Sequence, residues 1–265
     1  MSILLTLATS SLARQVSSNG AEGITLLDLP GFARRTLQLR GLNIPASMLA
    51  GWSLEDLDRL RDRADKASCP CLVLVEDTGL RLGDPEPVCT EAAQRVRRLA
   101  TAAHRLGCNA ISLCFNAPDT DEAFDNVATE LKGLMPYLER LELNVLISPH
   151  KGLTMAPERL TELIKRVGGF RIGSLPSFGH AAETGATIDT LRKLAPYAGA
   201  IHATVLGFDR KGGHKGYDLA ECVKAIRSVG FLNTLAIDFI GEGDPQDNIE
   251  KARQQLEAAL AAESA

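Results

Sequence analysis

Two short apolar runs separated by one amphipathic segment constrain the fold more than any other part of the chain. Residues 145–147 and 170–175 are apolar runs of the kind that form buried strands. Between them, Pro157 suits the first turn of a helix, and Gly168-Gly169 suits its end. Apolar residues recur in this helix at the spacing of one buried face, at Leu160, Leu163, Ile164 and Val167. The stretch therefore predicts a strand–helix–strand unit of an α/β protein.

Polar side chains directly follow both predicted strands. Ser148, His150 and Lys151 come after the first strand, and Ser177 and His180 come after the second. Parallel α/β proteins place their chemistry just beyond the carboxyl ends of the strands. We therefore expect these residues to lie at a functional site.

The same alternation continues along the whole chain. Further strands are predicted at residues 3–8, 37–44, 71–75, 110–115, 200–202 and 235–238, with helical patterns between them. Pro136 is expected to kink or split the helix that contains Phe124, Val127 and Leu131. Eight alternations without a linker, in a chain of 265 residues, predict one domain over residues 1–265, a single (β/α)8 TIM barrel.

Composition narrows the classes of function. The net charge of −4 gives no support to nucleic-acid binding, and no apolar run approaches the length that spans a membrane. The first residues lack a positively charged leader, so we expect a strand there and a cytoplasmic protein. The six cysteines have neither CxxC spacing nor a matching histidine cluster, which favours buried reduced thiols over a zinc site.

The stretch from Asn144 to His180 resembles the sugar phosphate isomerase/epimerase family, the xylose isomerase-like TIM barrels of the AP endonuclease 2-like superfamily. Residues 147–152 are similar to that family's Ile-Glu-Asn-His-Gly-Gly, and residues 177–180 to its Asp-x-Gly-His. Residues 200–202 resemble the seventh strand, which ends in a ligand histidine, and residues 235–239 resemble the eighth. The resemblance also implies that residues 24–29 lead into a helix, near 31–36, instead of forming a barrel strand.

The resemblance implies metal-assisted proton transfer beside a sugar carbonyl, with two carboxylates as acid and base. The family's metal-ligand positions fall on Ser148, Ser177, His202 and Asp238. Two acidic ligands are thus replaced by hydroxyls and a third is shortened from Glu to Asp. Ser148 also occupies one of the two catalytic carboxylate positions. Since hydroxyls bind divalent ions weakly in comparison with carboxylates, the metal site is expected to be degenerate.

The remaining candidates allow two interpretations. His150, His180, His202 and Asp238 follow predicted strand ends and could bind a divalent metal such as Zn, Mn or Co weakly, with His180, His202 and Asp238 as its core. The favoured alternative is that these histidines hydrogen-bond a polyol or fill the barrel mouth, with no cofactor. The expected catalytic residues are Asp238, His202 and His180. The expected substrate-binding residues are His150, Ser148, Ser177, Asn116, Lys151 and Arg210.

The sequence leaves the roles of two other polar segments undecided. The glycine-rich basic loop at residues 207–216 includes Arg210, Lys211, His214 and Lys215. Together with Lys151 these side chains could bind a phosphate, or the loop could simply be solvated. Glu76 and Asp77 could face the pocket or cap a loop.

Three functions follow. The first is an isomerase or epimerase of a sugar or polyol, phosphorylated or not, acting by proton transfer beside a carbonyl with an altered metal site. The second is a catalytically silent member that binds a carbohydrate or a partner protein. The third is an AP endonuclease-like hydrolase, which would need several zinc ions and a cationic face. Five histidines and the net charge of −4 give it the least support. A small-molecule sugar or polyol is the expected binding partner, and the protein could assemble as a homodimer.

Overall fold

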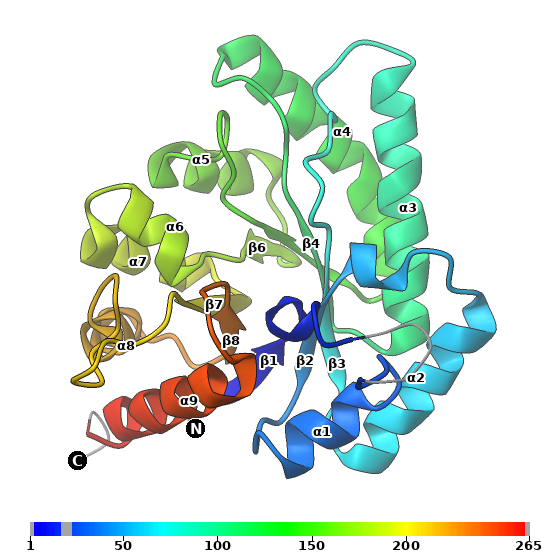
Figure 1. Cartoon of the computed structure of the whole chain (residues 1–265). Coiled ribbons are helices and arrows are strands. Elements are labelled where there is room, and N and C mark those ends of the chain that lie inside the picture. Colours follow the sequence, from blue (N-terminus) through cyan, green and yellow to red (C-terminus); the bar gives the residue numbers. More distant parts are fainter. Residues whose placement is uncertain (1–2, 17–22, 263–265) are drawn as a thin grey trace.

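The computed structural model describes residues 3–16 and 23–262. Within these residues, eight parallel strands form one sheet at the centre of the molecule (Figure 1). The strands are β1 (Leu4–Ala8), β2 (Leu42–Pro45), β3 (Cys71–Val75), β4 (Ala110–Leu113), β5 (Asn144–Ile147), β6 (Ile172–Ser174), β7 (Ala200–Val205) and β8 (Thr234–Phe239). Most of them are short, largely apolar segments, as expected for strands that are covered on both faces.

The sheet closes on itself between β6 and β7. The strand order is β6-β5-β4-β3-β2-β1-β8-β7, so these two strands lie at its ends. Parallel bridges join Ser174 to Ala198 and Ser177 to His202. The His202 amide donates to Pro176 O at 3.0 Å. The predicted (β/α)8 barrel is therefore confirmed.

The helices lie outside the strands (Figure 1). They are α1 (Leu29–Arg35), α2 (Leu54–Ala67), α3 (Val88–Leu106), α4 (Asp121–Arg140), α5 (Pro157–Val167), α6 (Phe178–Glu183), α7 (Thr187–Leu194), α8 (Leu219–Ser228) and α9 (Pro245–Ala262). Their ends follow local sequence signals. Ser53 and Asp56 form the predicted capping box of α2, and Gly107 ends α3 in the left-handed conformation. None of the described helices has the length and apolarity needed to cross a membrane.

The apolar faces of the helices are buried against the outer face of the strands. On α5, Leu160, Leu163 and Ile164 are buried as predicted, whereas Val167 is only half-buried. A second apolar cluster fills the inside of the barrel, where Val73, Ala110, Leu146, Leu175 and Ala200 pack together. All six cysteines are buried and free, as expected.

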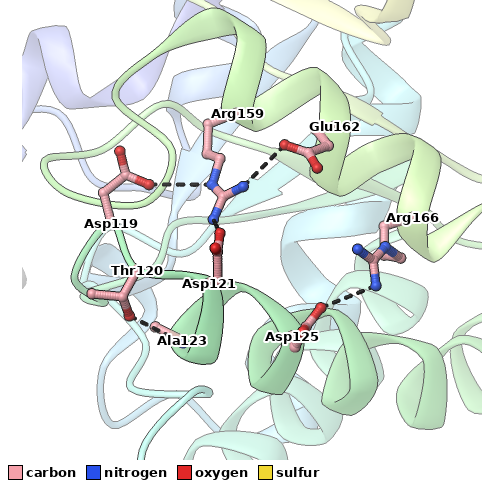
Figure 2. A network of polar contacts seen from close by, with 8 residues as sticks. All are labelled: Asp119, Thr120, Asp121, Ala123, Asp125, Arg159, Glu162 and Arg166. Carbon is pink, nitrogen blue, oxygen red and sulfur yellow. Dashed lines mark hydrogen bonds and ion pairs between the residues drawn. The ribbon is translucent and has the colours of Figure 1, made fainter.

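An ion-pair network joins α4 to α5 near the carboxyl ends of their preceding strands (Figure 2). Arg159 of α5 pairs with Asp119 at 3.2 Å, with Asp121 at 2.7 Å and with Glu162 at 3.0 Å. The guanidinium also lies 4.2 Å from the centre of the Phe124 ring. The network therefore fixes the two helices that follow β4 and β5, whose loops reach the barrel mouth.

Three elements differ from the sequence prediction. The second strand begins at Leu42 instead of residue 37, because Gln38 takes a positive φ of 58° that no strand allows. The helix α4 continues through Pro136 without being split, since burial of its apolar face outweighs the one hydrogen bond that proline removes. The segment after Ser177, expected to be a loop, forms the short helix α6.

Candidate active site at the mouth of the barrel

A cavity of about 480 Å³ opens at the carboxyl ends of β5 to β8. Five of the residues predicted from the sequence line it, namely His150, Lys151, Ser177, His180 and Asp238. Thr204 and Glu183 line it too, and were not predicted. The period of two along β7 could have indicated Thr204, because it shares a side of the strand with His202. The polar residues that follow four different strands thus converge, as the fold requires.

Asp238 is held from both sides by side chains distant in sequence. The Ser10 hydroxyl donates to Asp238 Oδ1 at 2.8 Å, and His202 Nδ1 lies 3.7 Å from Asp238 Oδ2. Burial by itself raises the pKa of Asp238, but His202 and Ser10 outweigh burial and hold the pKa below its usual value. The carboxylate is therefore ionised at neutral pH. Sequence reasoning missed Ser10, because no local pattern links residues 228 positions apart.

The other side of His202 is occupied by an amide. Asn43 of β2 is buried, and its Nδ2 lies 3.1 Å from His202 Nε2. Asn43 Oδ1 is buried without a hydrogen-bond partner among the described residues. If Nε2 accepts from the Asn43 amide, the neutral ring carries its proton on Nδ1, which faces Asp238. The imidazole is thus fixed between β2 and β8.

The two serines at the family's acidic positions are engaged in local hydrogen bonds. Ser148 Oγ lies 2.6 Å from Ser112 Oγ inside the barrel. Ser177 is the N-cap of α6, where its Oγ accepts from the His180 amide at 3.0 Å. Ser148 thus pairs with another side chain of the barrel, and Ser177 caps a helix.

His180 presents one nitrogen to the backbone and leaves the other without a partner. Its Nε2 lies 3.1 Å from Met155 O, so Nε2 carries the proton and donates to that carbonyl. Its Nδ1 is buried with no partner among the described residues. Burial lowers the pKa of His180, which is neutral above pH 6.5.

The family is settled by a match of the sequence to a family model. The model for the xylose isomerase-like TIM barrel matches residues 14–259. The chain belongs to this family. No curated protein matches the chain.

Solved structures share the fold of this xylose isomerase-like barrel. The structure of L-ribulose 3-epimerase is 13% identical, with a TM-score of 0.81, and the match covers 100% of this chain and 97% of that one. The structure of 3-keto-D-glucoside 4-epimerase from E. coli is 13% identical, with a TM-score of 0.76 and coverage of 97% and 99%. The IOLI protein with a bound zinc atom is 14% identical, with a TM-score of 0.76 and coverage of 98% and 99%.

The residues at this barrel's metal positions do not fit a hard divalent ion. Ser148 and Ser177 offer neutral hydroxyls that are already hydrogen-bonded, and the carboxylate oxygens of Asp238 are bound to Ser10 and His202. Within residues 3–16 and 23–262, no three His, Cys, Asp or Glu side chains are grouped to hold a metal ion. The histidines and Asp238 proposed from the sequence as a ligand set therefore do not form one here.

Three predicted substrate-binding residues, Ser148, Asn116 and Arg210, lie outside the cavity lining, and so does the predicted catalytic residue His202. Asn116 lies beside it, because a Cβ built on Gly79 would be 2.9 Å from Asn116 Cβ and 3.2 Å from His150 Nε2. Arg210 is exposed on the loop at residues 207–216. That loop is closed internally, since Asp209 Oδ1 accepts from the Lys211 and Gly213 amides at 2.8 and 2.9 Å.

His214 of the same loop has a structural role. Its Nε2 accepts from the Leu206 amide at 3.0 Å, and its Nδ1 lies 3.0 Å from Tyr217 O. Burial lowers the pKa of His214. A neutral ring with both nitrogens bound to the backbone does not bind phosphate. His214 is therefore excluded from the residues proposed to bind an anion.

The two acids after β3 hold loops and do not face the cavity. Glu76 is buried and accepts two hydrogen bonds from Arg95 of α3, at 2.5 Å from Nε and 3.0 Å from Nη2. Asp77 accepts from the amide of Ser47, at 3.2 Å, and from its hydroxyl. Glu76 also accepts from the Thr78 amide at 3.0 Å, so of the two interpretations left open by the sequence the structure supports loop capping.

A second cavity, of about 530 Å³, opens at the opposite end of the barrel. Its ionisable side chains are Arg171 and Tyr197, and it lacks a carboxylate or imidazole. This cavity therefore offers no carboxylate or imidazole to move a proton at neutral pH, whereas the cavity at the mouth offers Asp238.

Proposed function

We propose that this protein catalyses proton transfer beside the carbonyl of a sugar or polyol-derived ketone, in the manner of an isomerase. The observation that carries the proposal is the ionised carboxylate of Asp238 at a cavity lined by hydroxyl and imidazole groups. A cavity of this size accommodates a small sugar. The solved structures with this fold include several whose names are those of sugar epimerases, which supports the same class of reaction.

Asp238 is the base in this proposal. Its carboxylate removes the proton from the carbon beside the carbonyl, and the C–H electron pair becomes the carbon–carbon double bond of an enediolate. Ser10 and His202 hold the carboxylate in one orientation, which reduces the cost of positioning it during the reaction. The same contacts lower its basicity, so we expect slow turnover instead of fast turnover.

A single carboxylate favours isomerisation over epimerisation. Epimerisation removes a proton from one face of a carbon and delivers one to the other face, which requires a second acid–base group. Ser148 occupies the family position of that group, and its hydroxyl is bound to Ser112. Isomerisation transfers the proton between neighbouring carbons on one face of the substrate, and Asp238 is the one acid–base group that this proton transfer needs. The hydroxyl proton moves between the two oxygens.

Hydrogen–deuterium exchange tests the proposal. The protein is incubated in D2O with ketoses, inosose-like polyols and their phosphates, and NMR monitors deuterium beside the carbonyl. Exchange is expected in the native protein and is lost in Asp238→Asn, with a decrease of about 10²–10⁴-fold. Asp189→Asn is the matched control, because Asp189 is exposed on α7. Equal exchange in Asp238→Asn and native protein would exclude Asp238 as the base.

One observation favours a second function, the binding of a carbohydrate without turnover. Ser148, Ser177 and His202 are engaged in hydrogen bonds that serve the structure. In that case no sugar exchanges deuterium, but some sugars raise the melting temperature by occupying the cavity.

A further inference from the structure

Proton removal beside a carbonyl leaves a negative charge on oxygen, which the site must stabilise. Preorganised positive charge or hydrogen-bond donors at that oxygen usually provide the largest part of such catalysis. Ser148 and Ser177 carry no charge; the Ser148 hydroxyl is paired with Ser112, and Ser177 Oγ accepts from the His180 amide. The positive charge must therefore come from another residue of the cavity.

Lys151 is the one lysine or arginine among the described residues that line the cavity with Asp238. His180, which also lines the cavity, favours the neutral form because burial lowers its pKa. The cations of the loop at residues 207–216, Arg210 and Lys211, do not line the cavity. Lys151 is thus the group that can place a full positive charge beside a bound substrate.

The backbone that carries Lys151 is fixed on both sides. The His150 amide donates to Thr154 Oγ1 at 3.1 Å, and the Thr154 side chain is fully buried. Gly152 has a φ of 89° and pairs with Ala117 across a bridge, and a Cβ there would lie 2.2 Å from Ala117 O. Only glycine fits this position. The loop after β5 therefore holds the Lys151 backbone at the rim of the cavity.

The Lys151 ammonium is available to a ligand. Within the described part of the chain, it forms no ion pair with a carboxylate, whereas Lys193, by contrast, is paired with Glu158. Its side chain is exposed at the rim, and four rotatable bonds let it reach toward the ligand.

We propose that Lys151 is a catalytic residue that stabilises the enediolate oxygen, in the role that a divalent ion has elsewhere in the family. This inference rests on the proposed function. As Asp238 takes the carbon-bound proton, the carbonyl π electrons move onto oxygen, and the Lys151 ammonium binds that oxygen. The hydroxyl proton then moves to the first oxygen, Asp238 returns its proton to the former carbonyl carbon, and the carbonyl forms on the neighbouring carbon. The substrates are ketones or aldehydes with an adjacent hydroxyl, since only these give an enediolate with two neighbouring oxygens.

The first test measures deuterium exchange after treatment with EDTA. Exchange in the native protein is expected to be unchanged by EDTA, and Lys151→Met is expected to lower the rate by about 10²–10³-fold. Lys151→Arg keeps the charge and is expected to retain more activity than Lys151→Met. The matched control is Lys132→Met, because Lys132 is an exposed lysine of α4 that does not line the cavity. Loss of exchange with EDTA, or full exchange in Lys151→Met, would overturn the proposal.

The second test does not depend on turnover. Oxalate is a planar dianion with two adjacent oxygens, like an enediolate, and calorimetry measures its binding. We expect Lys151→Met to weaken binding by about tenfold or more, while Lys132→Met leaves it unchanged. Equal oxalate affinity in Lys151→Met and native protein overturns the role of Lys151 even if sugars exchange. If oxalate binding depends on Lys151 but no sugar exchanges deuterium, the proposed function is overturned. Lys151 then remains the residue that binds an anion in the cavity.

Discussion

His202 and Asp238 face each other diagonally across two neighbouring strands, with His202 Nδ1 3.7 Å from Asp238 Oδ2. The register of β7 and β8 sets this relationship, because Asp238 lies opposite Thr204 and His202 lies opposite Ala236. Diagonal neighbours of this kind are within reach of long side chains. The pair is thus a product of strand register, and Asn43 fixes it from β2.

The Asn43 contact predicts the tautomer of His202. In the neutral ring, we expect the proton on Nδ1, because Nε2 accepts from the Asn43 amide. Nitrogen NMR of the histidine rings measures this directly. In Asn43→Ala the acceptor role of Nε2 is lost, and we expect a mixture of the two tautomers. A native spectrum with the proton on Nε2 would contradict the assignment.

Restoring the acids at the two serine positions should restore metal binding. In Ser148→Glu with Ser177→Asp, two carboxylates join His202 and Asp238, so we expect Mn²⁺ to bind at least about tenfold more tightly than in the native protein, or about 1.4 kcal/mol. Asp can replace Ser177 as the N-cap of α6, which keeps that helix intact. Calorimetry measures the affinity, and Ser148→Gln with Ser177→Asn is the uncharged control. No gain in affinity would mean that these positions do not converge on one ion.

The buried face of α5 predicts a large loss of stability in Leu163→Ala. Leu163 is fully buried in the core, so the change should cost about 2–5 kcal/mol of unfolding free energy. Denaturant unfolding measures the loss. Glu158→Ala is the control on the exposed face, and its ion pair with Lys193 should contribute little. A harmless Leu163→Ala would contradict the packing of α5.

Arg159 is more important for stability than its place on the polar face of α5 suggests. From the sequence alone, Arg159→Ala would be expected to be nearly silent, like Glu158→Ala. The structure corrects this expectation, because the Arg159 side chain is 19% exposed, has three carboxylate partners and lies over Phe124. We expect a loss of about 1 kcal/mol, much of it retained at high salt because the ring contact remains buried.

A matched substitution separates the two contributions of Arg159. Arg159→Met keeps most of the packing against Phe124 and removes the three ion pairs shown in Figure 2. Thermal unfolding of Arg159→Met and Arg159→Ala, compared at low and high salt, measures each part. A native-like melting temperature for Arg159→Ala would contradict the network's role in joining α4 to α5.

His214 predicts a loss of stability in mild acid. Burial lowers its pKa in the folded protein, so the unfolded chain takes up a proton first as the pH falls. This contribution to stability is complete above pH 6.5 and decreases as the pH falls toward the lower folded pKa. In His214→Gln this part of the pH dependence should disappear. Unfolding at pH 7.5 and 5.5 measures it, with exposed His104→Gln as the control; an unchanged slope in His214→Gln would contradict it.

Much of the fold could be predicted from the sequence, because its signals are local. Residues 145–147 show a strand by their apolar run, and Leu160, Leu163 and Ile164 show the buried face of α5 by their spacing. The Ser53 capping box lies within four residues of chain. The rule that polar groups after parallel strands converge also placed Asp238 and His180 correctly at one cavity.

The partner of each polar side chain was decided only by the tertiary structure. Whether Ser148 faces a ligand or Ser112, and whether Glu76 faces the cavity or Arg95, depends on strand register and on the packing of α3. A shift of one residue in register moves a side chain to the opposite face of the sheet, and nothing near Ser148 in the sequence encodes that choice. The sequence thus determined the barrel and the end at which these polar residues gather. Register and packing determined that Asp238 lines the cavity between Ser10 and His202, and that Ser148 pairs with Ser112.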